Sequence, residues 1–546
     1  MIRTTNTNGI LAAATAVALL PIAADAAPKK AKTQQRLPNI LCVTCEDISC
    51  RLGCYGDQTA VTPNLDAFAQ HAIRYTDMFT TVGVSAPSRS ALITGMYPST
   101  LCSNNMRVGG KDRPEGIPKY AVVPPTGVKC YTEYMRAAGY YCTNNSKCDY
   151  QFGCPLTAWD ESSGKAHWKN APEGVPFFAI FNLNITHESQ IWKGEKRKLA
   201  IDPADVVVPP YFPDDEVSRR TLAILYSNIK LMDQQFQDLV DEVEAAGKLD
   251  NTIIIWYSDN GGPLPREKRS LYDTGTKVPF MISFPDGYKA GTVDKNLHMF
   301  PDIPATILSL AGINPPDYMQ GEAFLGKYAE KKPREYVYGA RTRMGESVDK
   351  QGAVRDHHYR YLRNYNSEHA NYGTVAYRLQ MPLMTHMLDL KEQGLLNRDQ
   401  MQWFLAPRPV EEFYDLDKDP YELHNEIDNP AYEKDIARLK AEYNRWIAEE
   451  CPRWDLTEIE AIETMWPGGI QPVVKAPKVE MTPDGVLISS DEDGVSFAYQ
   501  INGKGMNEKH WYLYNGPVQL KKGDRMTTVA VRAGMRNSKK IDYVYE

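Results

Sequence analysis

Two pairs of hard oxygen donors stand directly after apolar runs that read as buried strands. They are Glu46-Asp47 and Asp259-Asn260. The carboxyl ends of parallel strands meet at one edge of a sheet, so we expect the two pairs to lie close together. Carboxylate and amide oxygens suit Ca²⁺ or Mg²⁺, whereas Zn²⁺ would favour histidine or thiolate. For either pair alone, the alternative is a carboxylate that caps a helix.

The stretch 85–95, SAPSRSALITG, predicts a short helix that starts beside a serine and an arginine. Pro87 suits the first helical position, and Gly95 suits the residue just past the end. We therefore expect Ser85 immediately before the positive end of the helix and Arg89 in its first turn. A cation there opposes the helix dipole, and a bound anion would make it favourable. The alternative is an ordinary capped helix with a solvated arginine.

Alternating strand-like runs and amphipathic helices must position these residues. Strand-like runs occupy 39–44, 73–75, 177–183, 252–257 and 279–283, with helical patterns near 63–72 and 218–246. This alternation predicts the α/β class, with a mainly parallel sheet flanked by helices on both faces. Both donor pairs would then lie at the carboxyl edge of that sheet.

The rest of the chain divides by composition. We expect an α/β catalytic domain over 37–332 and a smaller α+β subdomain over 333–465. A linker rich in proline and glycine follows. Short alternating runs separated by turns then predict a small β-sandwich module over 479–546.

The N-terminus has the pattern of a secretory signal peptide over 1–26. Arg3 precedes an apolar stretch, and Ala24-Asp25-Ala26 forms an A-x-A cleavage site. The apolar stretch is too short for a membrane anchor, and no later stretch could span a bilayer. We expect cleavage near Ala26 and a periplasmic or secreted mature protein.

Composition limits the partners. The chain has 546 residues and a formal net charge of −7, so a general nucleic-acid surface is not expected and a polyanion would need a local basic pocket. Nine of the ten cysteines lie between Cys42 and Cys154. Export would permit disulfides, whose pairing stays open. The spacing of Cys42, Cys45, Cys50 and Cys54 also allows a metal cluster, but a strand cysteine that packs as a small hydrophobe is the favoured interpretation.

Over roughly 38–448, the chain resembles the formylglycine-dependent sulfatases of the alkaline-phosphatase-like fold. The family signature is Cys or Ser, any residue, Pro, Ser and Arg, then a short helix that ends in Thr-Gly. Here it runs from Ser85 to Arg89, with Thr94 and Gly95 closing the helix. The stretches CEDIS, THESQ and SLYDTGTKVP look most like the heparan N-sulfatase-like branch.

The resemblance implies an exported enzyme that hydrolyses a sulfate ester or sulfamate on a sulfated carbohydrate, such as a glycosaminoglycan or mucin-type sugar. A maturase would oxidise Ser85 to formylglycine, whose hydrate is the nucleophile. Ca²⁺, or alternatively Mg²⁺, would be held by Ser85 together with the two donor pairs, Glu46, Asp47, Asp259 and Asn260.

The resemblance also assigns roles to other side chains. Arg89 would steady the hydrate, Lys147 and Lys268 would contact the sulfate, and His187 would protonate the leaving oxygen. Two positions depart from the family. Glu46 stands where aspartate is common, and Asp149 stands where a histidine usually follows the first lysine. Aspartate is normally ionised at neutral pH, so we expect Asp149 to act as a base or to orient Lys147.

Substrate contacts are predicted at Arg107, soon after the nucleophile helix, and at Arg355 in the second region; the alternative for each is a surface charge. The expected partners are a sulfated carbohydrate and the maturase, with no nucleic acid and no stable membrane span. Two other functions stay open. One is a phosphodiesterase or phosphonate hydrolase of the same fold. The other is a sulfated-glycan-binding protein with impaired catalysis, which the substitution at Asp149 suggests.

Overall fold

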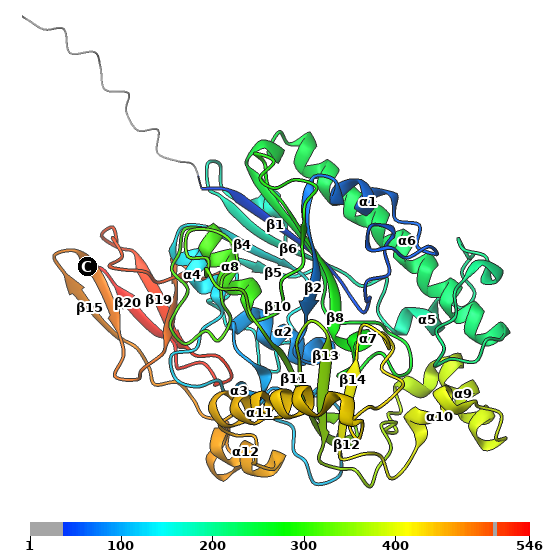
Figure 1. Ribbon diagram of the computed structural model, residues 1–546. Helices are drawn as coiled ribbons and strands as arrows, with labels where there is room; N and C mark the ends of the chain where they lie inside the picture. Colours follow the sequence, from blue (N-terminus) through cyan, green and yellow to red (C-terminus); the bar gives the residue numbers. More distant parts are fainter. Residues whose placement is uncertain (1–36, 506–509) are drawn as a thin grey trace, which may run out of the picture. The chain divides into compact units, whose positions relative to one another are not determined.

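The computed structural model describes residues 37–505 and 510–546, within which Pro38–Glu546 form one compact unit (Figure 1). The predicted signal peptide, 1–26, lies outside the described residues. Across the part of the chain that the structure describes, no helix has the length and apolar character needed to cross a membrane.

A nine-stranded sheet forms the centre of this unit, in the order β10-β2-β8-β7-β1-β6-β4-β5, with β9 paired to β2. β1 lies between β6 and β7 and runs parallel to both, whereas β8 is antiparallel to its neighbours β2 and β7. The predicted mainly parallel sheet is thus confirmed. Its strands are β1 (Asn39–Cys45), β2 (Ala72–Phe79), β4 (Tyr141–Asn145), β5 (Glu161–Ser162), β6 (Phe177–Leu183), β7 (Thr252–Ser258), β8 (Lys277–Ser283), β9 (Val293–Asp294) and β10 (His298–Met299).

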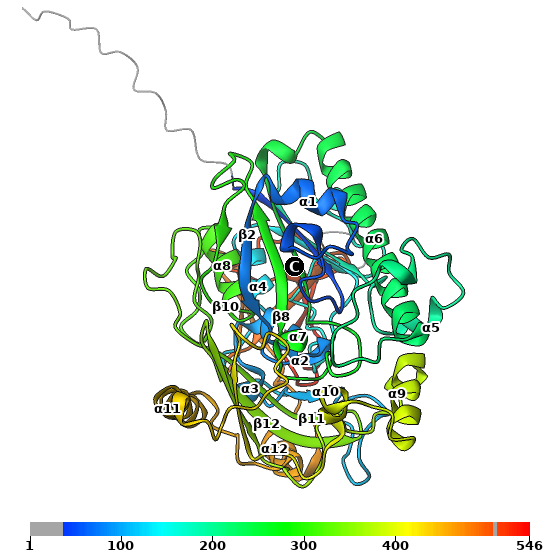
Figure 2. The ribbon, with the colours of Figure 1, turned by 45° about the vertical axis from the view of Figure 1, so that its right-hand side comes forward.

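Helices cover both faces of the sheet, as Figures 1 and 2 show. α1 (Pro63–Ala69) and α6 (Glu216–Ala245) pack on one face; α2 (Ser85–Thr94), α4 (Tyr131–Ala137) and α8 (Asp302–Leu310) pack on the other. β1 is buried along its whole length, because its side chains alternate between these two helical layers.

The strand cysteines take part in this packing. Cys42 packs with the layer of α4 and α8, and Cys45 packs with the layer of α6. All ten cysteines lie within the described residues, and each is free. The interpretation of Cys42 as a small hydrophobe is confirmed, because burial leaves its thiol among apolar side chains and raises its pKa.

α2 differs from the expectation at its start. It begins at Ser85 itself, so Pro87 is its third residue and Arg89 lies beyond its first turn. A proline is still tolerated there, because the first four N–H groups of a helix have no partner within the helix. The predicted end is confirmed: Gly95 caps the helix with a φ of 72°, and a Cβ there would clash with Met319.

A second sheet of five strands has the order β14-β13-β12-β11-β3. β3 comes from the region before residue 333, yet it pairs in parallel with β11. α11 (Glu433–Glu450) packs on the sheet through Leu439, Tyr443 and Trp446. The strands are β3 (Asn105–Met106), β11 (Val337–Met344), β12 (Ser347–Arg355), β13 (Tyr359–Asn364) and β14 (Glu411–Asp415). Further helices are α3 (Pro98–Leu101), α5 (Ser189–Lys193), α7 (Asp273–Thr276), α9 (Pro382–Glu392), α10 (Arg398–Met401) and α12 (Glu458–Met465).

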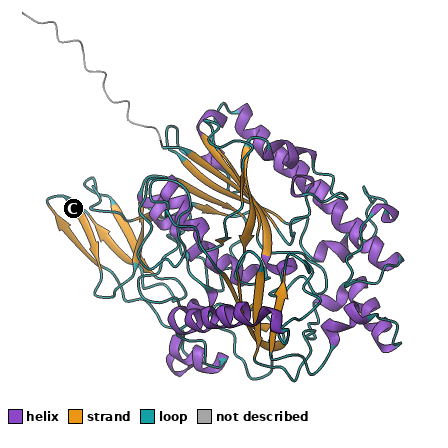
Figure 3. Cartoon of the chain, viewed as in Figure 1, coloured by secondary structure: helices purple, strands orange, loops and turns teal. Residues whose placement is uncertain are grey.

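The C-terminal residues form two small antiparallel sheets, drawn as orange strands in Figure 3. One contains β15 (Lys478–Thr482) and β16 (Gly485–Ser489); the other contains β17 (Ser496–Ile501), β18 (Tyr512–Leu513), β19 (Arg525–Val531) and β20 (Ile541–Val544). Side chains of both sheets meet in one apolar cluster. The β-strands expected here are therefore confirmed, while the domain boundaries at 332, 465 and 479 stay predictions.

Candidate active site

The register of the central strands brings the two donor pairs together. Cys45 at the end of β1 lies opposite Ser258 at the end of β7, so the next residues of both strands emerge side by side. The backbone N–H of Asp47 donates to Oδ1 of Asp259 at 3.3 Å, and Nδ2 of Asn260 donates to Oδ1 of Asp47 at 3.0 Å. Glu46 lies in the same group, and all of these residues are buried.

The N-terminus of α2 points into this group. Ser85 is 2% exposed, and its Oγ donates to Oδ1 of Asn260 at 3.2 Å. Arg89, one turn further along, donates from Nε to Oδ2 of Asp259 at 3.0 Å and from Nη1 to Oδ1 of Asn182 at 2.7 Å. The positive charge of Arg89 is thus balanced by a buried carboxylate.

Two lysines face the same carboxylates from other elements. Lys147, just after β4, donates to Oε2 of Glu46 at 2.9 Å and lies 4.0 Å from Asp259. Lys268, in the loop before α7, donates to Asp47 and lies 3.3 Å from Oε1 of Glu188. Burial disfavours the charged form of Lys268, but the attraction of Asp47 and Glu188 outweighs it and raises the pKa of this lysine.

His187 follows β6 and completes the ring of reactive side chains. Its Nε2 lies 3.7 Å from Oε2 of Glu46, and its Nδ1 is 2.9 Å from Oγ of Ser189. Burial, and then the nearby charge of Lys268, lower the pKa of His187 to about 2. The imidazole is therefore neutral when no anion is bound between the lysines.

Glu188 and Arg269 also belong to the site, although the sequence patterns do not predict them. Arg269 binds both oxygens of Glu188, at 2.9 and 2.6 Å, and the N–H of Glu188 donates to Oδ2 of Asp47 at 2.7 Å. Arg269 and Lys268 lower the pKa of Glu188 although burial opposes them. The signal in the sequence is adjacency, because each residue directly follows a predicted site residue.

Asp149 borders a cavity of about 370 Å³ that Arg107 also lines. Its backbone φ is 53°, and its Oδ2 is buried without a hydrogen bond. The carboxylate that contacts Lys147 is Glu46. Arg355 lies elsewhere: it is buried and faces Asp273 at 3.3 Å and Asp77 at 3.9 Å.

The oxygen donors of the two pairs can be compared with the ligands that a divalent cation requires. Within residues 37–505 and 510–546, no three His, Cys, Asp or Glu side chains are arranged as a metal-binding group. The three carboxylates are instead paired with Lys147, Lys268 and Arg89. In kind, the donors fit Ca²⁺ or Mg²⁺, since all are oxygens. Burial raises the pKa of Glu46. The negative charges of Asp259 and Asp47 raise it further, whereas Lys147 lowers it, so a bound cation would relieve the repulsion among the three carboxylates.

The central sheet with its two helical layers has the alkaline-phosphatase-like fold. The chain is similar to a solved 2-O GAG sulfatase, with a TM-score of 0.56 and 18% identity over 77% of this chain and 94% of that one. It is equally similar to the phosphonate monoester hydrolase of Agrobacterium radiobacter, with a TM-score of 0.56 and 15% identity over 83% and 100% of the two chains. At these identities, the likeness shows the fold alone.

Sequence comparisons identify the family. The sulfatase family model matches residues 38–170 and 163–313, and the model of the N-sulphoglucosamine sulphohydrolase C-terminal region matches 266–375. An ulvan-active sulfatase of Formosa agariphila is 40% identical over 541 residues, 92% of this chain and 91% of the relative. Human N-sulphoglucosamine sulphohydrolase is 24% identical over 76% of this chain and 91% of the relative. The chain belongs to the sulfatase family and is a sulfuric ester hydrolase.

Proposed function

We propose that this sulfatase acts on a sulfated carbohydrate, from which it removes sulfate held as an ester or a sulfamate. Its relatives include an ulvan-active sulfatase, an N-sulphoglucosamine sulphohydrolase and an N-acetylglucosamine-6-O-sulfatase, which supports a sugar substrate. The observation that carries the reaction type is Ser85 at the N-terminus of α2, bonded to Asn260, with Lys147 and Lys268 on the neighbouring carboxylates of Glu46 and Asp47.

The chemistry at position 85 requires more than a serine. A serine that attacked a sulfate ester would remain as a stable serine sulfate. Oxidised by a maturase to formylglycine, position 85 supplies a hydrated aldehyde, whose second hydroxyl allows sulfate to be expelled. The intact motif from Ser85 to Arg89 supports this modification.

Each of the surrounding residues then has its own role in the proposed reaction. Lys147 and Lys268 bind sulfate oxygens. Their ammonium groups are now paired with Glu46 and Asp47, and a sulfate anion would compete with these carboxylates for them. Arg89 orients the hydrate from within α2, which also presents its positive end to the anion. Sulfate bound near Lys268 would offset a charge that helps to lower the pKa of His187, so that His187 can take up a proton and give it to the leaving oxygen. Asp149 takes a proton when the sulfated enzyme breaks down. Glu46, Asp47, Asp259 and Asn260 would hold Ca²⁺, which supplies Lewis-acid polarisation of a sulfate oxygen.

Mass spectrometry of the peptide that contains Ser85, from protein made in its own host, tests the modification. Formylglycine makes the peptide about two mass units lighter, through the loss of two hydrogens, and fully active enzyme with unmodified serine would contradict it. Ser85→Ala should abolish turnover and leave the melting temperature close to that of the wild type, since this side chain is a site residue.

Calcium can be tested without relying on activity. Adding Ca²⁺ to chelator-treated protein should raise the melting temperature, because an ion at about 100 times its Kd stabilises the folded state by about 2.7 kcal/mol. Asp259→Asn should remove most of that rise. Stoichiometric zinc in freshly purified native protein would argue against a calcium site.

We propose that the enzyme is exported through the segment 1–26, and N-terminal sequencing of the mature protein would locate the cleavage site.

Aryl sulfate and aryl phosphate assayed side by side would separate the sulfatase from a phosphodiesterase or phosphonate hydrolase. Tight binding of a sulfated sugar without turnover, by protein that carries formylglycine, would instead indicate impaired catalysis.

A further inference from the structure

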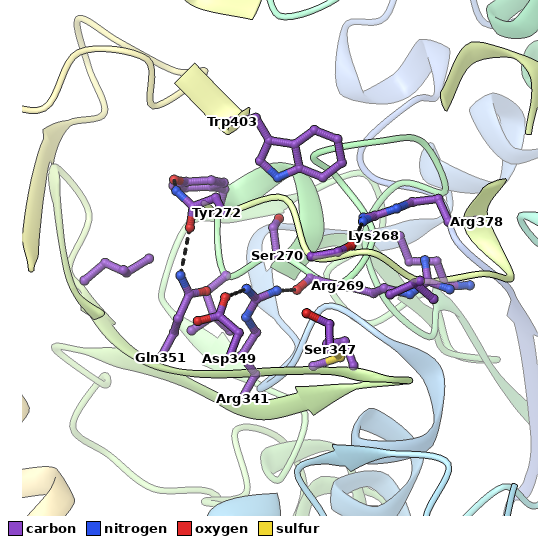
Figure 4. Close-up of a pocket in the computed structure, with 16 residues that line it drawn as sticks. Lys268, Arg269, Ser270, Tyr272, Arg341, Ser347, Asp349, Gln351, Arg378 and Trp403 are labelled. Carbon is purple, nitrogen blue, oxygen red and sulfur yellow. Dashed lines mark hydrogen bonds and ion pairs between the residues drawn. The ribbon is translucent and has the colours of Figure 1, made fainter. Parts of the chain in front are cut away.

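A small arginine-lined pocket lies directly beside Lys268. Arg269, Arg341, Arg378 and Trp403 also line it, and its cavity of about 20 Å³ has room for one small polar group. Figure 4 shows Arg378 reaching into the pocket from one side and Arg341 from the other, with Trp403 above them. The pocket therefore shares a wall with the group that we propose binds sulfate.

The positive charges in this pocket are not all balanced. Arg269 is paired with both oxygens of Glu188. Arg341 and Arg408 share a single carboxylate, Asp349. Arg378 has no carboxylate within ion-pair distance among residues 37–505 and 510–546. The pocket thus holds more guanidinium groups than its carboxylates can neutralise.

Arg378 lacks a carboxylate partner although it is buried, with only 4% of its surface exposed. Its Nη2 donates to the backbone carbonyl of Gly373, while its Nε is buried with no partner. The guanidinium lies over the rings of Tyr372 and Trp403, 5.1 and 4.8 Å from their centroids. A buried charge without a counter-charge is costly unless a ligand supplies one. Burial, with Arg269 nearby, lowers the pKa of Arg378 to about 9, so it stays cationic at neutral pH.

The same segment reaches the reaction centre. Tyr377 directly precedes Arg378, and its ring lies 6.5 Å from that of His187 and 5.3 Å from that of Trp192. His187 is the proposed proton donor to the leaving oxygen, so Tyr377 borders the space that the leaving sugar must occupy. An acidic substituent on that sugar, or on its neighbour, can then approach Arg378.

We propose that Arg378, with Arg341 opposite it, binds the carboxylate of an acidic sugar next to the sulfate that is removed. This inference rests on the proposed function and adds the substrate class, a sulfated glycan that contains a uronic acid. A planar carboxylate matches the fork of a guanidinium and fits so small a cavity better than a tetrahedral sulfate does. Arg378 thereby selects the substrate and takes no part in the bond-breaking step.

Matched substrates test this assignment. The set holds a sulfated disaccharide with a uronic acid, its carboxyl-reduced counterpart, a counterpart with a second sulfate in place of the carboxylate, and a simple aryl sulfate. Arg378→Met keeps an unbranched, flexible side chain as far as the position of Nε but removes the charged guanidinium that lies over the rings, and Arg378→Lys keeps the charge without the fork. Arg398→Gln, an exposed position on α10, removes one charge elsewhere and serves as the control.

We expect Arg378→Met to raise KM for the uronic-acid substrate by about 10- to 100-fold, with kcat little changed. Arg378→Lys should give an intermediate loss. The carboxyl-reduced and aryl substrates should change less than about twofold, as should every substrate with the control variant. Equal losses on all substrates, or a wild type that does not distinguish the uronic acid from its reduced form, would overturn the proposal. A loss confined to the doubly sulfated substrate would overturn the assignment to a carboxylate.

Direct binding separates this inference from the proposed function. The Ser85→Ala protein should bind the uronic-acid disaccharide by calorimetry, and the added Arg378→Met change should weaken that binding by a similar factor. Should Arg378→Met fail to fold, Arg378→Lys and inhibition of the wild type by free uronate provide the same comparison. A wild type that hydrolyses no sulfate ester would refute the proposed function, while the binding measurements would still decide the carboxylate site.

Discussion

At the scale of single residues, the two lysines and Arg89 of the candidate site already have partners of opposite charge. Lys147 is paired with Glu46, Lys268 with Asp47, and Arg89 with Asp259. Such buried pairs add little net stability, because the cost of removing both charges from water offsets their attraction. The pairs do hold each side chain in place. A bound anion could then replace the carboxylates as partner of the lysines, and a bound cation could replace the lysines as partner of the carboxylates.

The departure from the family at Asp149 gives a prediction at this scale. Asp149→Asn should slow breakdown of the sulfated enzyme more than its formation, by roughly 100-fold, the range of general-base effects. Rapid mixing with an activated aryl sulfate would then show an initial burst followed by slow turnover. His187→Ala should instead affect substrates with poor leaving groups most, since those need protonation. Wild-type rates for Asp149→Asn on both aryl and glycan substrates would leave Asp149 with a purely structural role.

At the scale of elements, the second sheet is joined to the central part by buried ion pairs. Glu422, in the turn after β14, accepts from the backbone N–H of Asp273 at the start of α7, and Arg360 on β13 contacts both acidic residues. Nε of Arg360 lies 2.7 Å from Oε1 of Glu422 but is not aligned for a hydrogen bond. Burial therefore dominates, and it raises the pKa of Glu422 to about 7.

This raised pKa predicts a pH-dependent stability. Folding favours the protonated form of Glu422, so its contribution is full below the unfolded value of 4.5 and is lost as the pH rises through about 7. Glu422→Gln imitates the protonated form. The variant should match the wild type near pH 5 and exceed it by about 2 kcal/mol near pH 8. Urea unfolding at the two pH values measures this difference, and a constant difference would show that Glu422 does not titrate in this range.

At the scale of the whole described chain, the C-terminal β-strands are hydrogen-bonded to α4 of the central part. Arg136 on α4 donates to the backbone carbonyl of Trp511 at 2.8 Å, and Asn515 donates to that of Ala137 at 2.8 Å. Leu156 packs against the sheet that contains β17 and β19. None of the site residues described above has a hydrogen bond or ion pair to 478–505 or 510–546.

Removal of residues 471–546 should therefore affect stability more than chemistry. It takes one partner from Arg136 and exposes the apolar surface around Leu156, so we expect the melting temperature to fall by roughly 5 °C. The kcat for a small aryl sulfate should stay within about twofold, because the reactive side chains keep their partners. Scanning calorimetry and aryl sulfate kinetics on the same preparation give the two values. A large loss of kcat with an unchanged melting temperature would indicate a direct role for this region.

The sequence by itself determined the class of fold and predicted that the two donor pairs lie together. Continuous apolar runs located β1, β6 and β7, because strands buried on both faces must be apolar throughout. The rule that parallel strands share a carboxyl edge predicts Glu46 and Asp47 next to Asp259 and Asn260. Local motifs also located Gly95 at the end of α2, since a left-handed residue there favours glycine.

Only the tertiary structure decided which charges face one another. Glu46 as the partner of Lys147, Glu188 between Lys268 and Arg269, and the burial of Arg355 all depend on contacts between residues far apart in the chain. Arg378 reads in the sequence as one more surface arginine. Its significance appears only when folding buries it beside other guanidinium groups with too few carboxylates, because burial turns an ordinary charge into one that needs an anion.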